Sequence, residues 1–182
     1  SLIKAGVTCF KIEGRMKTPE YVSVVTSIYR KYINLALSDK PYIVEDSDIK
    51  KLMQVFNRGG FSAGNFSSDE NRNYVYKKKP NNMGLYIGNV SHFNKDKGLL
   101  TFKTTESLSI GDTVSLENEE HKYTVTELMK NRQNISRATI GDTITIGRMK
   151  GKIKLGDEIY KLSSKSLSKS IKDFISSQNV KI

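Results

Sequence analysis

The hydrophobic pattern near the start of the chain changes from a strand-like run to a helical spacing. β-Branched and aromatic residues fill residues 5–15 and end at Gly14, which predicts a buried strand and a turn. Thr18 can then cap a helix with its hydroxyl, and Pro19 suits the first helical position. The apolar positions that follow at a spacing of three and four are Tyr21, Val25, Ile28 and Tyr32. We therefore expect a helix that runs to about Ser38.

A second, shorter helix is expected where Asp46 or Ser47 can cap a first turn. Its apolar positions are Ile49, Leu52, Met53 and Phe56. The glycine pair that begins at Gly59 predicts its end. Residues 61–79 are polar and hold little periodicity, so they are interpreted as a loop and linker.

From Met83 onward the hydrophobic period is two, which is typical of strands. The expected strands are Leu85 to His92, Gly98 to Thr104, Thr113 to Glu117, Tyr123 to Leu128, Thr143 to Ile146 and Glu158 to Leu162. A Gly-Asp pair after an apolar residue recurs at Gly111-Asp112, Gly141-Asp142 and Gly156-Asp157. Because glycine supplies a positive φ and aspartate can bond nearby amides, each pair predicts a tight turn. Six strands with such turns suit a small closed antiparallel β-barrel.

The last residues, from Ser163, carry apolar side chains at helical spacing and form either a short docked helix or a frayed tail. These apolar positions are Leu167, Ile171, Phe174 and Ile175. The expected fold class is α+β. The expected units are a strand with two helices over residues 1–60, a linker over 61–82, the barrel over 83–162 and the tail over 163–182.

The composition excludes several kinds of site. One cysteine and two histidines cannot build a disulfide framework, a cysteine-rich zinc site or a complete iron–sulfur ligand set. Cys9 is expected to be a small core hydrophobe, and His92 and His121 lack metal-ligand spacing. No run of about 18 apolar residues and no signal-peptide pattern is present, so we expect a cytoplasmic chain with no membrane partner and no metal or other cofactor of its own.

Positive charge is concentrated at the two ends of the chain. The formal net charge is +11, and the basic and acidic counts are 14 and 8 over residues 1–79, 12 and 10 over 80–162, and 4 and 1 over 163–182. An excess of this kind favours an anionic partner such as nucleic acid.

Two local basic runs are candidate contacts with RNA. They are Lys77, Lys78 and Lys79, and the alternating set Arg148, Lys150, Lys152 and Lys154. On a strand, alternation by two would place the second set on one face, where it could follow a phosphate backbone. The same charges can instead protect an exposed strand edge from pairing. Tyr74 and Tyr76 beside the first run combine aromatic and cation as single-stranded RNA sites do, although a hinge between domains has the same composition.

The front segment resembles peptidase family U32, the collagenase-like proteins. The resemblance lies in GVTCFKIEGRMKTPEYV from Gly6 to Val22, in the Tyr29-Arg30 pair and in FNRGGF from Phe56 to Phe61. The block NMGLYIGNV that begins at Asn82 and the Gly-Asp pairs resemble that family's C-terminal domain, a barrel similar to domain 2 of translation elongation factors. The resemblance covers nearly the whole chain but only the C-terminal part of the family's length, so we expect that a TIM-like N-terminal domain is missing.

The resemblance implies a parent enzyme whose chemistry has two descriptions. The family was named for protease activity toward collagen, whereas several members are implicated in RNA modification, notably hydroxylation of the wobble uridine of transfer RNA, often with an iron–sulfur cluster. Such a cluster would lie in the missing N-terminal part.

Three functions of this chain follow from those descriptions. The first is that of an accessory fragment, inactive alone, that presents RNA, chiefly transfer RNA, to a uridine-modifying catalytic domain. The second is a domain that grips collagen or another polypeptide for a protease. The third is a purely structural or dimerisation barrel.

The resemblance also gives Lys11, Glu13 and Arg15 a candidate role. If residues 10–13 form a strand of the TIM-like domain, Lys11 and Glu13 point to one side and Arg15 lies beyond its C-terminal end, where active sites gather. The two cations could hold an anionic substrate while Glu13 orients one of them. The alternative is a buried ion pair that only fixes the strand to the next helix.

Overall fold

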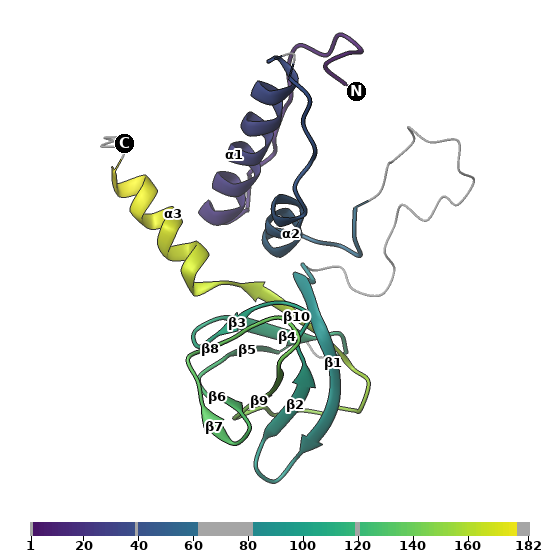
Figure 1. The fold of residues 1–182 in the computed structure, drawn as a ribbon, viewed down its shortest axis with the longest axis vertical. Coiled ribbons are helices and arrows are strands. Elements are labelled where there is room, and N and C mark those ends of the chain that lie inside the picture. Colours follow the sequence, from purple (N-terminus) through teal and green to yellow (C-terminus); the bar gives the residue numbers. More distant parts are fainter. Residues whose placement is uncertain (1, 39, 62–81, 119–120, 178–182) are drawn as a thin grey trace, which may run out of the picture.

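The computed structural model describes residues 2–38, 40–61, 82–118 and 121–177 and contains three helices and a curled antiparallel sheet. Figure 1 shows α1 and α2 at one end of the molecule, the sheet at the other, and α3 running from the sheet toward α1. None of these helices is long and apolar enough to cross a membrane.

The first helix confirms the expectation from spacing and capping. Helix α1 spans Pro19–Ala36, and the hydroxyl of Thr18 accepts a hydrogen bond from the backbone N–H of Tyr21 at 3.3 Å. Its buried residues are Val24, Val25 and Ile28. The apolar stripe therefore faces the other helices rather than solvent.

The second helix is present, but its expected cap is wrong. Helix α2 spans Asp46–Val55, and its N-cap is Glu45, whose side chain makes no capping bond. The Glu45 carboxylate instead accepts a hydrogen bond from Lys31 of α1 at 2.6 Å. The helix ends at Val55 because Phe56 has extended backbone angles, several residues before Gly59.

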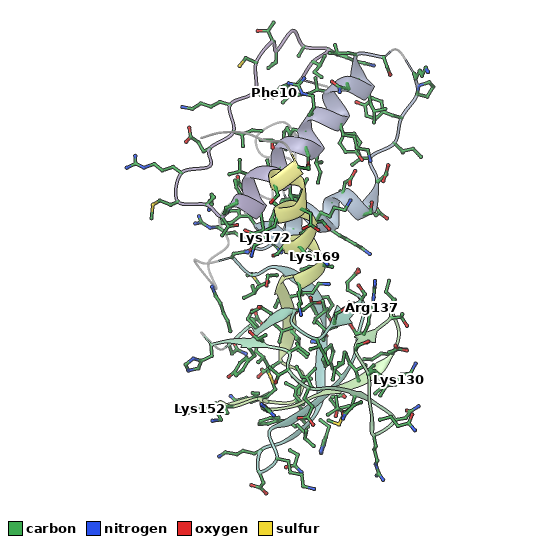
Figure 2. The ribbon with its side chains drawn as sticks, turned by 90° about the vertical axis from the view of Figure 1, so that its left-hand side faces the viewer. Phe10, Lys130, Arg137, Lys152, Lys169 and Lys172 are labelled. Atoms are coloured by element: carbon green, nitrogen blue, oxygen red, sulfur yellow. The ribbon has the colours of Figure 1, made fainter. Side chains whose placement is uncertain are left out.

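The strand expected over residues 5–15 does not form. Residues 7–14 have no regular structure, and they pair with no strand among the described residues. A strand needs a neighbour to satisfy its backbone, and this segment lies along α1 instead, as the position of Phe10 in Figure 2 shows. Cys9 is exposed, so its expected place in a core is also wrong.

The sheet contains eight strands in the order β5-β4-β10-β1-β2-β9-β6-β7, and β3 pairs separately with β8. The strands are β1 (Leu85–Asn94), β2 (Leu99–Lys103), β3 (Leu108–Ser109), β4 (Thr113–Leu116), β5 (Lys122–Thr124), β6 (Leu128–Lys130), β7 (Gln133–Asn134), β8 (Arg137–Ala138), β9 (Thr143–Ile146) and β10 (Glu158–Ser163). Every neighbouring pair is antiparallel.

The long strand β1 curls the sheet. Its first half pairs with β10 and its second half with β2, and the register shifts once in each half, between Tyr86 and Gly88 and between Val90 and His92. Such bulges bend a strand and increase its twist. The inward side chains thereby enclose one core, which includes Ile87, Leu100, Phe102, Leu116, Ile144 and Ile159.

The expected closed barrel of six strands is therefore only partly right. Strand β9 has the expected bounds, and β1, β2, β4 and β10 lie where strands were expected. The expected strand from Tyr123 to Leu128 is two strands, β5 and β6, separated at the buried Val125. Strands β3, β7 and β8 were not expected, because two residues carry no readable period.

The three Gly-Asp pairs form turns, as expected. In each, the aspartate accepts a hydrogen bond from the backbone N–H three residues earlier, and the glycine has a φ of +85° to +92°. The N–H of Ser109 donates to Asp112 at 3.0 Å, that of Thr139 to Asp142 at 2.9 Å, and that of Lys154 to Asp157 at 2.8 Å. Local chemistry alone therefore specifies these turns.

Residues from the tail form a docked helix, α3 (Lys165–Ser177). Ile171 is buried against Val24 and Ile28 of α1. At its other end, the backbone N–H of Lys165 donates to Asp112 at 3.0 Å. Helix α3 is thus fixed to both the sheet and α1.

Asn57 joins α2 to the start of the sheet. Its backbone N–H donates to the Oδ1 of Asn82 at 2.7 Å, and its Nδ2 donates to the carbonyl of Gly84 at 2.7 Å. Its own Oδ1 accepts the N–H of Gly60 at 2.6 Å. The side chain is buried, so these bonds fix how the helices meet the sheet.

Candidate nucleic-acid interface

The basic run from Arg148 to Lys154 is a loop, so the strand on which the four cations would share one face does not form. Arg148 and Gly151 have φ values of 62° and 121°, outside the negative φ range of regular strands. Met149 is buried in the sheet's core and Ile153 is partly buried against it. The four basic side chains are exposed because the apolar ones between them turn inward.

This loop is fixed to the turn between β1 and β2. The backbone N–H of Met149 donates to the carbonyl of Gly98 at 2.9 Å. Gly98 has a φ of +62°, and a Cβ there would lie 2.8 Å from the carbonyl oxygen of Met149. Tyr123 also donates its hydroxyl hydrogen to the carbonyl of Lys150. These contacts therefore hold the loop in one position at this end of the sheet.

The same contact brings two further lysines to the loop. Lys95 and Lys97 lie in the turn that ends at Gly98, and both are exposed. With Arg148 and Lys150 they make four cations at the end of the sheet remote from α1 and α2, here termed the distal cluster (Figure 1). None of the four forms an ion pair with another described residue, although Asp96 lies in the same turn.

The other basic candidates from the sequence are less closely grouped. Lys152 and Lys154 are exposed farther along the loop, and Figure 2 shows Lys152 at the edge of the sheet opposite Lys130. The run from Lys77 to Lys79 lies outside the described residues.

Lys11 and Glu13 do contact each other, but on the surface. Their side chains form an ion pair at 2.9 Å with 85% and 70% of their areas exposed. An exposed pair contributes at most about 1 kcal/mol, so the structure does not show the alternative, a buried pair that fixes a strand. Arg15 is exposed as well and forms no ion pair within the described part of the chain.

A cation and aromatic cluster at the start of α1 was missed by the sequence analysis. The ammonium of Lys17 lies 3.5 Å from the ring centroid of Phe56, and the guanidinium of Arg58 lies 5.2 Å from it. Tyr21 meets the same ring edge-on at 5.9 Å. Both cations lie within the sequence blocks that carry the family resemblance, but only the fold brings those blocks together.

Two carboxylates in the structure have strongly lowered pKa values. A hydrogen bond from Lys31 lowers the pKa of Asp48 to about 2, with help from Lys51 and Tyr32. A hydrogen bond from Lys130 lowers the pKa of Asp142 to about 2, with help from the backbone of Thr139. Both groups tie elements of the fold together through bonds from lysines, so they indicate structure rather than acid–base chemistry.

Lys161 is a buried cation within the sheet. Burial lowers its pKa, while Asp112 at 3.9 Å acts in the opposite direction. Its ammonium donates to the carbonyl of Ser107 at 2.7 Å. Among the described residues, no three His, Cys, Asp or Glu side chains are grouped to hold a metal ion, and both histidines are exposed.

Two grooves could accept apolar groups. One, of about 1120 Å³, lies between the opening segment and α1 and includes Val7, Phe10 and Val22. The other, of about 680 Å³, lies between α2 and the sheet and includes Tyr86 and Tyr160, whose rings meet edge-on at 5.9 Å.

Comparison with known proteins identifies relatives of two named activities. Residues 1–75 match the sequence model of peptidase family U32. An uncharacterized protease of Methanocaldococcus jannaschii is 28% identical over 84% of this chain and 39% of its own. The tRNA hydroxylation protein P of Haemophilus influenzae is 26% identical over 78% of this chain and 31% of its own, and a collagenase of Porphyromonas gingivalis is 27% identical over 90% of this chain and 41% of its own.

A solved structure from the same family also matches. It is the C-terminal domain of a Geobacillus thermoleovorans U32 peptidase, with 15% identity, a TM-score of 0.38, and coverage of 42% of this chain and 90% of that domain. The chain spans well under half the length of each of the three curated relatives.

Proposed function

We propose, on the premise that the chain belongs to peptidase family U32, that it is the C-terminal accessory part of an RNA-modifying enzyme. Its role would be to hold RNA by its phosphates while a catalytic domain elsewhere in the protein modifies a uridine. Any iron–sulfur cluster would belong to that catalytic domain. Transfer RNA is the first candidate because one relative is named a tRNA hydroxylation protein.

The distal cluster is the observation that carries this proposal. Lys95, Lys97, Arg148 and Lys150 lie on two segments that a backbone hydrogen bond holds together. Cations without acidic partners attract polyanions, and each one that neutralises a phosphate releases a counterion. A fixed loop loses less conformational entropy on binding than a free one.

A binding titration with transfer RNA over a salt series tests the proposal. We expect the affinity to fall steeply with salt, as phosphate neutralisation requires. Lys95→Glu, Lys97→Glu and Lys150→Glu together should lower the affinity at least about tenfold and make the slope of log K against log salt shallower by about 2. Arg148 is kept because its left-handed backbone could couple charge to folding.

The matched control reverses three exposed cations at the helical end, Lys4, Arg30 and Lys40. It changes the net charge by the same amount, so a specific site predicts a much smaller effect. An affinity that is absent at low salt, or that does not respond to salt, contradicts the proposal.

Polypeptide binding is the second candidate, and the groove between α2 and the sheet favours it. Proline-rich chains in the polyproline II conformation dock into aromatic-lined grooves, and Tyr86 and Tyr160 supply two adjacent rings. One relative is named a collagenase. Binding of a collagen-like peptide that Tyr86→Ala removes, with no RNA binding by the same preparation, would establish this function in place of the first.

A further inference from the structure

Helix α3 presents one apolar face and one basic face. At about 100° per residue, Lys165, Lys169 and Lys172 lie within a narrow stripe, because they are spaced by four and three. Leu167 and Ile171 lie on the other side of the helix and pack against α1. The three lysines are exposed, and Figure 2 shows Lys169 and Lys172 on the side of α3 that is turned to the viewer.

The lysines of this stripe have no acidic partner among the described residues. The helix contains one acidic residue, Asp173, and no ion pair joins it to Lys169 or Lys172. Elsewhere in the chain, Lys31, Lys51 and Lys130 are each bonded to an aspartate. The α3 lysines thus differ from these three, which stabilise the fold through ion pairs with aspartates.

The sheet fixes the start of the stripe. The backbone N–H of Lys165 donates to Asp112, and a Cβ on Gly111 would lie 2.6 Å from the Cδ of Lys165. The stem of Lys165 therefore lies directly over the turn that contains Gly111. Together with the burial of Ile171 on α1, this contact holds the stripe in one orientation.

Arg137 extends the stripe onto the sheet. Its Cα is paired with that of Ser109 across β3 and β8, and Ser109 donates its N–H to the same Asp112 that binds Lys165. Figure 2 shows Arg137 on the sheet next to the start of α3, on the same face as Lys169. Arg137 is exposed and forms no ion pair within the described part of the chain.

We propose that Arg137, Lys165, Lys169 and Lys172, here termed the α3 stripe, bind the phosphate backbone of a double-stranded RNA stem. The inference rests on the proposed function and adds a second contact with RNA, of a different kind from the distal cluster. Lys165 and Lys172 are seven residues apart, which is about 10 Å along a helix. The row is therefore long enough to contact more than one phosphate of a strand.

Two features favour a duplex over the other polyanions. Sites for single-stranded RNA add aromatic side chains on which bases stack, and the α3 stripe contains none. A basic amphipathic helix binds a membrane by burying its apolar face in the lipid, but Ile171 of α3 is already buried against α1. What remains is a fixed row of charges, which suits a regular backbone.

The test compares a stem-loop RNA of about 12 base pairs with a single-stranded oligonucleotide of the same length, across a salt series. Lys165→Glu, Lys169→Glu and Lys172→Glu together should weaken binding of the stem-loop at least about tenfold and make its salt slope shallower by about 2 to 3. Binding of the single strand should change less than threefold. The triple Gln variant, which keeps the helix and removes only charge, should show a smaller loss of the same pattern.

The failure of each proposal gives a different result. If wild-type protein binds the stem-loop and the α3 variants bind it equally well, the α3 stripe is not an RNA contact, whereas the distal-cluster variant still decides the proposed function. If wild-type protein binds no RNA, the proposed function fails. Equal losses for stem-loop and single strand overturn the preference for a duplex, and binding to anionic phosphatidylserine vesicles that only the α3 variants lose assigns the stripe to a membrane.

Discussion

The carboxylate of Asp112 accepts a hydrogen bond from the backbone N–H of Lys165 at 3.0 Å, across 53 residues of sequence. Its other oxygen accepts the N–H of Ser109, also at 3.0 Å. Asp112 is buried, so one side chain both closes a turn of the sheet and satisfies a donor at the start of α3. At Asp112 the repeated Gly-Asp turn contacts a helix, whereas the aspartates of the other two turns accept hydrogen bonds from Lys130 and Asn118.

Replacing Asp112 by alanine should detach the start of α3. Loss of two hydrogen bonds to a buried carboxylate should lower the free energy of unfolding by about 2–4 kcal/mol, measured by urea denaturation. Limited proteolysis should then cleave within residues 165–177. The matched variant is Asp142→Ala, which removes the same turn contact but no helix contact. Equal protection of α3 in both variants would contradict the role assigned to Asp112.

Acid should destabilise the contact between α1 and α2 through Asp48. Lys31 donates to this buried carboxylate at 2.8 Å, Tyr32 at 3.0 Å and Lys51 at 3.1 Å. The pKa of Asp48 falls from 3.8 to about 2, mainly because of the bond from Lys31. A lowered carboxyl pKa stabilises the fold above the unfolded value, and this stabilisation is lost as the pH falls from 3.8 to about 2.

The variant Asp48→Asn isolates that contribution. At pH 7 its free energy of unfolding should be about 2 kcal/mol lower than that of the wild type, because a buried charged acceptor is lost. The difference should shrink as the pH falls through the window between 3.8 and about 2. Chemical denaturation at several pH values measures it, and Asp46→Asn, an exposed change in the same helix, serves as the control. A difference that is constant down to pH 2 would exclude Asp48 as its source.

Local signals account for what could be predicted from the sequence. Thr18, Pro19 and the apolar spacing lie within one helix, and each Gly-Asp turn is closed by a bond over three residues. The opening segment could not be assigned in the same way, because a strand exists only beside another strand. Its β-branched residues predicted burial, but Val7 and Thr8 are exposed, and Phe10 and Ile12 are only partly buried beside α1.

The candidate site shows the same limit. Alternation from Arg148 to Lys154 would give one basic face on a strand, but the left-handed backbone at Arg148 makes the segment a loop. Lys95 and Lys97 joined the cluster through the contact between Gly98 and Met149, which spans about fifty residues and leaves no local signal. The spacing of Lys165, Lys169 and Lys172 was visible, but its meaning depended on which face of α3 the protein covers.

Asn57→Ala should loosen the junction between the helices and the sheet. Two hydrogen bonds are lost with this side chain, one from its Nδ2 to the carbonyl of Gly84 and one from the N–H of Gly60 to its Oδ1. Removing a buried amide of this kind should cost about 2–3 kcal/mol of unfolding free energy. Asn89→Ala is the matched control, since Asn89 is exposed and should cost less than about 1 kcal/mol. Hydrogen exchange at the N–H of Gly60, which donates to the Asn57 side chain, should accelerate only in the Asn57 variant.

Gly98→Ala should disturb the contact between Gly98 and Met149 that holds the basic loop in place. The new Cβ would lie 2.8 Å from the carbonyl oxygen of Met149, and the residue would also have to keep a φ of +62°. The backbone term alone should cost about 1–2 kcal/mol, and the close approach adds to it because Met149 is held in the core.

Gly141→Ala separates those two terms, because Gly141 has a φ of +89° and a Cβ there would meet nothing within 4 Å. Its loss of unfolding free energy should therefore be the smaller one. If the distal cluster depends on the contact between Gly98 and Met149, Gly98→Ala should also weaken RNA binding, although it removes no charge. Gly141→Ala should leave the affinity for RNA unchanged. Binding that is equal in the two variants, measured under conditions where both are folded, would show that the position of the loop does not matter to the cluster.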